Sequence, residues 1–125
     1  MFKVVIRSFL PAILALVVAT LLFCLPGEEF PEAGWLQNLH LDKIVHIGLF
    51  AVLVVVWSLP FAARSNDKRK VNQRFLLVMI LFIVYGIAIE FIQRDLIPHR
   101  SFEAMDIVAD TFGCVVGIVI AKWVS

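Results

Sequence analysis

The sequence predicts an all-α membrane protein, a bundle of four transmembrane helices, and three observations support this fold class. First, 62% of the 125 residues are hydrophobic, well above the roughly 45–50% of a soluble domain. Second, the apolar residues fall into four runs, each about as long as a helix that crosses a bilayer. Third, the basic residues gather beside or between these runs, as they do in cytoplasmic segments. We therefore expect a single domain over residues 1–125, with helices at about 8–25, 44–63, 75–93 and 104–124.

The first apolar run, Ser8 to Leu25, follows the basic residues Lys3 and Arg7. A basic start and an apolar core also describe a secretory signal. The run is long for a signal core, however, and the segment LPGEEFPEAGW at its end lacks a small-x-small cleavage site. Pro11 falls in the first turn, where a proline does little harm. We expect an uncleaved transmembrane helix.

A polar connector, Pro26 to Leu41, leads to the second apolar run, which extends from Ile44 to about Ala63. Asp42 and Lys43 precede this run, and His46 is the first strongly polar side chain within it. An acid suits a helix N-terminus because its charge meets the positive end of the helix dipole. Asp42 and His46 are four positions apart, so one face of the first turn carries both.

The most basic segment, Arg64 to Arg74, contains five basic residues and a single acid, Asp67. We interpret it as a cytoplasmic loop. Contact with anionic headgroups explains it better than nucleic-acid binding, because no aromatic residues are interleaved. With four spans, the N- and C-termini, which carry Lys3, Arg7 and Lys122, then lie in the cytoplasm as well. The acidic connector falls outside.

The third run, Phe75 to Ile92, returns toward the outer side. Gly86, Glu90 and Gln93 recur at spacings of four and three at its end, so they share one helical face. We expect the glycine to serve helix packing and the two polar residues to face other protein groups.

The fourth run, from about Glu103 to Val124, carries a stripe of acids followed by small residues. Asp106, Asp110, Gly113 and Gly117 recur every three or four positions, which places them on one face. The two glycines match the small-xxx-small pattern, which lets a neighbouring helix approach closely. That neighbour is either another helix of the same chain or one of a second copy in a homo-oligomer.

The predicted topology brings the polar helix ends together at the outer face of the membrane. At a rise of 1.5 Å per residue, Asp110 lies roughly 9–10 Å along its helix from Ala104, still within the outer leaflet. Charged side chains are costly in hydrocarbon and usually have partners and a function there. The predicted binding cluster consists of Asp42, Lys43, His46, Glu90, Gln93, Arg100, Asp106 and Asp110. A purely structural role, with polar groups that only join helix ends, remains an alternative.

Four segments of the sequence resemble a known family. They are DKIVHIGLFAVL from Asp42 to Leu53, EFIQ from Glu90 to Gln93, HRSFE from His99 to Glu103 and DIVADTFGCVVG from Asp106 to Gly117. In order and spacing they are similar to the VanZ-like family of small bacterial membrane proteins. Asp110 departs from the family pattern, in which an Asn is common, and this extra acid raises the question of whether one carboxyl group is protonated.

The resemblance implies a multi-pass protein of the bacterial cytoplasmic membrane and a link to resistance to glycopeptide antibiotics such as teicoplanin. It brings no cofactor, no metal and no catalytic residue. We expect a non-enzymatic protein whose pocket engages a lipid-linked or surface component of the cell envelope, or a partner protein in the membrane. Lys43 and Arg100 would bind an anionic headgroup. We expect no nucleic-acid partner.

Two other functions stay open at this point. One is a hydrolase or transferase acting on an envelope lipid, with His46 as general acid or base and a carboxylate that orients it. A metal site is a variant of this reading, since His40, His46 and His99 all fall on the outer side near Glu90 and Asp106, but no HExxH-like spacing is present. The other is half of a proton-coupled transporter that uses Asp106 and Asp110. It lacks polar residues deeper in any span.

Overall fold

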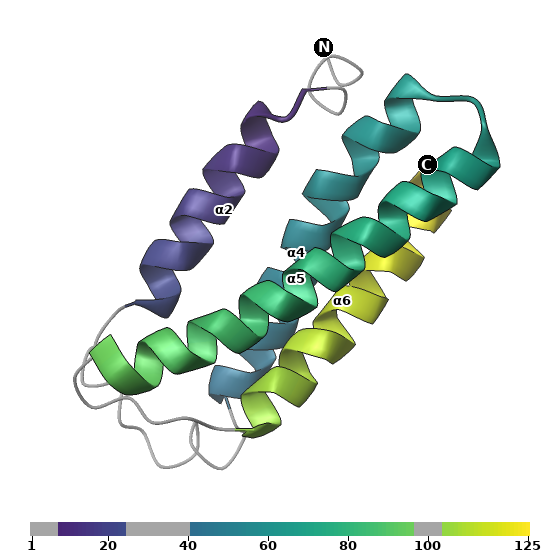
Figure 1. Cartoon of the computed structure of the whole chain (residues 1–125). Coiled ribbons are helices and arrows are strands. Elements are labelled where there is room, and N and C mark those ends of the chain that lie inside the picture. The colour runs from purple at the N-terminus through teal and green to yellow at the C-terminus, as the bar shows by residue number, and fades with distance from the viewer. Residues whose placement is uncertain (1–7, 25–40, 97–103) are drawn as a thin grey trace.

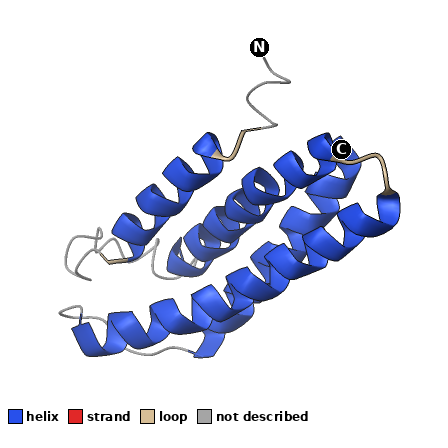
Figure 2. Cartoon of the chain, turned by 45° about the horizontal axis from the view of Figure 1, so that its top comes forward, coloured by secondary structure: helices blue, strands red, loops and turns tan. Residues whose placement is uncertain are grey.

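Four helices make up the described part of the chain. The computed structural model describes residues 8–24, 41–96 and 104–125. The helices are α2 (Leu10–Phe23), α4 (Leu41–Arg64), α5 (Lys68–Leu96) and α6 (Ala104–Val124). Consecutive helices run in opposite directions along one long axis, and these residues contain no strand (Figures 1 and 2). The predicted all-α membrane bundle is confirmed.

Three of the four described helices, α4, α5 and α6, are long and apolar enough to cross a membrane. Many of their large apolar side chains point outward, for example Leu77, Val84 and Val115, and an exposed apolar surface of this extent is typical of a lipid-facing bundle. Helix α2 has 14 residues, or about 21 Å at 1.5 Å per residue. It is shorter than the span expected over residues 8–25, of which the last lies outside the described residues.

The structure differs most from the expected helix bounds at the start of α5. This helix begins at Lys68 rather than near residue 75, so only residues 65–67 of the segment interpreted as a loop are non-helical. Asp67 caps the new start, because its Oδ1 accepts a hydrogen bond from the backbone N–H of Arg69 at 3.0 Å, as N-cap residues do. Hydropathy marks the end of the apolar core and does not mark the end of the helical backbone.

Helices α4 and α6 pack closely against each other, and two glycines of α6 allow this close approach. A Cβ atom added to Gly113 would lie 2.5 Å from the carbonyl oxygen of Ile47, and one added to Gly117 would lie 2.8 Å from that of Ala51. No real side chain is accommodated at such distances. The partner of this small-xxx-small face in the described chain is therefore α4.

Helix α2 stands at one side of the bundle (Figures 1 and 2). In its last turn, the Thr20 hydroxyl and the Tyr85 hydroxyl lie 2.6 Å apart and share a hydrogen bond between α2 and α5. At its start, the Arg64 guanidinium lies over the Phe9 ring, 4.8 Å from its centroid. The start of α2 therefore lies at the end of the bundle where α4 finishes.

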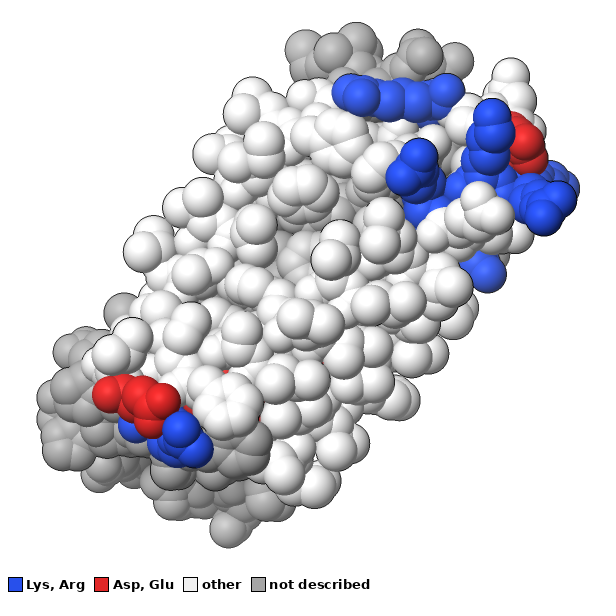
Figure 3. Space-filling model, in the orientation of Figure 1, with Lys and Arg blue, Asp and Glu red and all other residues white. Residues whose placement is uncertain are grey.

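The two ends of the bundle differ in charge. At one end, six of the eight described Lys and Arg side chains gather around the turn between α4 and α5 and the end of α6 (Figure 3). They are Arg64, Lys68, Arg69, Lys70, Arg74 and Lys122. A wide band without charged side chains separates this basic end from the other (Figure 3). At the opposite end the described surface shows Arg94 and Asp95, which pair with each other at 2.7 Å.

Candidate functional site

The structure brings six of the predicted site residues together inside the bundle, at the end opposite the basic one. Three helices supply them within their terminal two turns: Lys43 and His46 from α4, Glu90 and Gln93 from α5, Asp106 and Asp110 from α6. Five of the six are buried, the lysine being partly exposed. We call this group the polar cluster.

His46 and Asp110 form the innermost contact of the polar cluster. His46 Nδ1 lies 2.6 Å from Asp110 Oδ1, a short hydrogen bond between the imidazole ring and the carboxyl group. Gly86 of α5 makes room for this pair, because a Cβ atom there would lie 2.7 Å from Asp110 Oδ2. The glycine predicted to serve packing thus opens the space that holds an acid.

A second pair, Lys43 and Asp106, is more exposed to the surface than the His46–Asp110 pair. Lys43 Nζ lies 2.8 Å from Asp106 Oδ1, and the lysine side chain keeps 19% of its surface exposed. Asp106 also stands in the first turn of α6, where its charge is favoured by the helix dipole. His46 Nε2 lies 3.9 Å from Asp106 Oδ2, so the outer pair and the inner pair adjoin one another.

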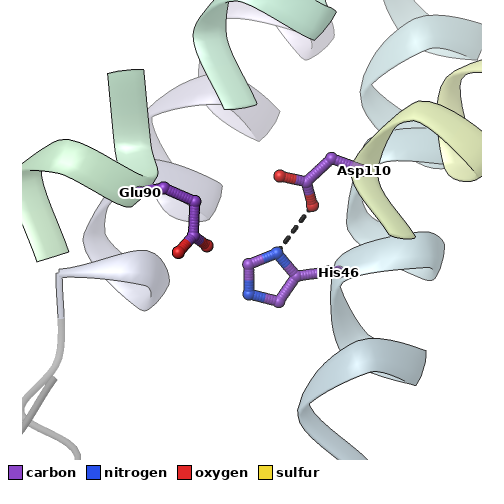
Figure 4. A group of neighbouring side chains, drawn as sticks. All are labelled: His46, Glu90 and Asp110. Atoms are coloured by element: carbon purple, nitrogen blue, oxygen red, sulfur yellow. Dashed lines mark hydrogen bonds and ion pairs between the residues drawn. The ribbon is translucent and has the colours of Figure 1, made fainter. Parts of the chain in front are cut away.

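Glu90 completes the inner part of the polar cluster. Its side chain is 0% exposed, and its carboxyl group points from α5 toward His46 and Asp110 (Figure 4). One ligand-type atom from each of these three residues lies within 4.8 Å of the other two. A carboxyl group in such a dry place is costly unless other groups compensate for it, so the three side chains act as one unit.

Two phenylalanines, which sequence reasoning did not include, form the apolar wall of the site. The Phe23 ring lies 4.9 Å from the His46 ring, and the Phe50 ring stacks near-parallel to it at 6.5 Å. Gln93 also donates a hydrogen bond from Nε2 to the carbonyl oxygen of Phe23 at 2.8 Å. The end of α2 therefore closes one side of the polar cluster, and no feature of its apolar sequence signals this role.

Two predicted site residues lie outside what the structure describes. Arg100, one of the two, is not among the described residues. His40 and His99, which belong only to the metal alternative, are not among them either. Asp42 belongs to α4, but its side chain is outside the description. Their parts in the site therefore stay predictions.

The composition of the polar cluster limits its chemistry. Its described members are three carboxyl groups, one lysine, one histidine and one amide. Such a set can exchange protons, hold a cation between its acids, or present the partly exposed ammonium group of Lys43 to an anion. In a neutral His46 that carries its proton on Nδ1 toward Asp110, Nε2 is the ring atom with a lone pair.

A comparison with protein families now adds an independent finding. The family model described as VanZ/LLP1 matches residues 9–125 of the chain, which confirms the resemblance inferred from the four sequence segments. Comparisons with curated proteins and with solved structures find no match.

Proposed function

The chain belongs to the VanZ/LLP1 family, and we propose that it is a multi-pass protein of the bacterial cytoplasmic membrane whose polar cluster engages a lipid-linked envelope component with an anionic headgroup. The observation that carries this proposal is the burial of five polar or charged side chains from three helices at one end of an otherwise apolar bundle. Holding three helices together requires fewer groups, and intramembrane ionisable residues usually serve a function.

The charge difference between the two ends supports an outward-facing polar cluster. Lys and Arg are enriched on the cytoplasmic side of membrane proteins, and six of the eight described Lys and Arg side chains gather at the end opposite the polar cluster (Figure 3). The basic end then lies in the cytoplasm, together with the C-terminus. The polar cluster lies in the outer leaflet, where lipid-linked envelope precursors are used.

Lys43 is the group that we assign to the headgroup. Its side chain is partly exposed at the surface of the polar cluster, and its ammonium group forms an ion pair with Asp106. A phosphate that approaches along the outer leaflet meets this cation before it meets the buried acids. Arg100, which sequence reasoning placed in the adjoining loop, would supply a planar, bidentate partner for the same phosphate.

A second candidate function is supported by the His46–Asp110 hydrogen bond. A histidine held at Nδ1 by a buried carboxylate has its Nε2 free to act as general base, as in many hydrolases. The substrate would again be an envelope lipid. Turnover of undecaprenyl-linked substrates by the purified protein, lost in His46→Ala, would favour this function over binding alone.

Topology is the first test of the proposal. Reporter fusions after residue 66, in the turn between α4 and α5, should report a cytoplasmic location. Fusions in the connector at residues 26–40 should report an external one. The reverse result would place the polar cluster in the cytoplasmic leaflet and rule out recognition of an outer-leaflet headgroup.

Lipid binding is the direct test. Purified protein is titrated with undecaprenyl phosphate and, as a control, with undecaprenol, which lacks the phosphate. We expect Lys43→Met to weaken binding of the phosphate by at least about fivefold, since one lysine near an anionic lipid contributes about 1 kcal/mol. The matched control Lys70→Met, at the basic end, should bind as the unchanged protein does. Equal affinity for undecaprenol, or an unaffected Lys43→Met, would contradict the assignment.

The proposed role in the envelope has a cellular test as well. Cells that carry Arg100→Ala or Asp106→Ala should become as sensitive to teicoplanin as cells that lack the protein, while the variant proteins insert at normal levels. If both variants keep full tolerance, the polar cluster is not the functional site.

A further inference from the structure

Three potential metal ligands converge inside the bundle from three different helices. His46 of α4, Glu90 of α5 and Asp110 of α6 each offer a nitrogen or oxygen atom, and these atoms lie within 4.8 Å of one another. All three side chains are buried and point into the same space (Figure 4). We propose that they bind one divalent transition-metal ion such as Zn²⁺ or Mn²⁺. This proposal goes beyond lipid recognition and does not depend on it.

The ligand types suit such an ion. One imidazole with two carboxylates is a set that first-row divalent metals accept, whereas Mg²⁺ and Ca²⁺ favour oxygen alone. Around a tetrahedral zinc, with bonds of about 2.0–2.1 Å, ligand atoms lie roughly 3.4 Å apart. Ligand atoms at the 4.8 Å limit would therefore have to close in by about 1.4 Å. The hydrogen-bonded atoms of His46 and Asp110, which are 2.6 Å apart, would have to separate by about 0.8 Å.

The contact between His46 and Asp110 shows where the ion would lie. His46 Nδ1 and Asp110 Oδ1 are 2.6 Å apart and share a proton. Metal ligands must be deprotonated, so an ion bound to both residues would take the place of this proton. The two ring nitrogens point in opposite directions, so this ion would bind His46 through Nδ1.

An independent observation points to a cation beside Asp110. Asp110 is 1% exposed, yet its Oδ2 has no hydrogen-bond partner among the described residues. A buried carboxylate oxygen without a donor is rare and costly. A metal ion bound to the Asp110 carboxylate would satisfy this oxygen and offset the charge of the carboxylate in a dry site.

Spacing in the sequence does not reveal this ligand set. A metal was not expected because no HExxH-like spacing is present, and the metal alternative grouped His40, His46 and His99 near Glu90 and Asp106, without Asp110. The three residues identified by the structure come from separate helices, so no local pattern joins them.

The test measures metal uptake by the full chain. The protein is purified through a tag without histidines, placed in lipid nanodiscs and stripped with a chelator. It is then dialysed against Zn²⁺ or Mn²⁺ and freed of unbound metal, and its metal content per chain is measured by inductively coupled plasma mass spectrometry. We expect about one ion per chain and a higher midpoint of thermal unfolding with metal. Glu90→Gln and Asp110→Asn should bind at least about tenfold more weakly.

Asp95→Asn is the matched control, since Asp95 lies at the same end of the bundle but is exposed and paired with Arg94. This variant should take up metal as the unchanged protein does. Less than about one-tenth of an ion per chain at saturating metal in the unchanged protein would overturn the proposal, whatever the variants do. Equal uptake in Glu90→Gln and Asp110→Asn would also overturn it, because the metal would then be bound elsewhere. Failure of lipid binding with normal metal uptake would count against the proposed function alone.

Discussion

The polar cluster and the basic end are the two polar regions of this bundle, and they use charge in opposite ways. At the basic end the lysines and arginines are exposed and lie beside one another around a short turn. In the polar cluster the acids are buried, and Lys43 and His46 are held by them at 2.8 and 2.6 Å. Exposed charges contribute little to stability but determine orientation in the membrane. Buried charges must be matched by specific partners.

The largest effect should come from removing an acid of the polar cluster. Asp110→Ala should lower the free energy of unfolding by about 3 kcal/mol, because it opens a cavity and leaves the buried His46 ring without its partner. Thermal unfolding or steric trapping in micelles measures this. Asp95→Ala, a change of the same kind in an exposed pair, should leave stability unchanged. Similar losses in the two variants would mean that the polar cluster is no better packed than the surface.

The second-largest loss of stability should come from disturbing the close contact between α4 and α6, which holds two helices of the polar cluster together. Gly113→Ala should cost about 2 kcal/mol, since its Cβ would lie 2.5 Å from the Ile47 carbonyl oxygen and the helices would have to separate. Gly48→Ala is the control, because a Cβ there meets nothing within 4 Å. It should keep or raise stability by up to about 1 kcal/mol through helix propensity. Equal changes in stability for Gly113→Ala and Gly48→Ala would show that α4 and α6 are not packed as closely as in the structure.

A smaller effect should follow from the bond that ties α2 to the polar cluster. Gln93→Leu removes the hydrogen bond to the Phe23 carbonyl oxygen and should cost about 1 kcal/mol, which is typical of a hydrogen bond between membrane helices. Gln73→Leu changes an exposed glutamine of the same helix and should not weaken the bundle. Protease protection of α2 provides a second measurement. Cleavage of α2 by the protease in both variants would argue against packing of α2 on the polar cluster.

The smallest effect should occur at the basic end. Lys70→Gln changes one exposed charge and should alter stability by less than about 0.5 kcal/mol. Only when several basic residues of this end are replaced together should reporter fusions show mixed topology. A loss above about 1 kcal/mol from Lys70→Gln alone would mean that the basic end also carries specific contacts.

The sequence predicted the helices well because each apolar run is long and its ends are polar. The expected fourth helix has the same bounds as α6, Ala104–Val124. The start of α5 was missed, since a charged segment can be helical outside the hydrocarbon and only its cap, Asp67, distinguishes it from a loop. The spacing of polar residues also identified the helix faces that meet in the polar cluster.

The partners within the polar cluster could not be predicted in the same way. The sequence placed Lys43 and His46 in the same cluster as the acids but did not show which acid each contacts, whereas the described structure pairs Asp106 with Lys43 and Asp110 with His46. Arg100 lies outside the described residues. Which side chains meet depends on how far each helix is rotated and how closely it approaches its neighbours. Phe23 and Phe50 were missed because, in a chain this apolar, nothing in the sequence distinguishes a phenylalanine against the site from one against lipid.

The dependence of α4 on α6 has a consequence for how the protein is made. Synthesis proceeds from the N-terminus, so α4 and α5 enter the membrane before α6 exists. During that interval Lys43 and His46 lack the two acids that hold them, and the surface of α4 that later receives Gly113 and Gly117 is still covered by lipid. Helix α6 therefore completes the polar cluster as well as adding a helix to the bundle. A ribosome that stalls before α6 would leave an insertion intermediate that cellular quality control can recognise by its unpaired charges.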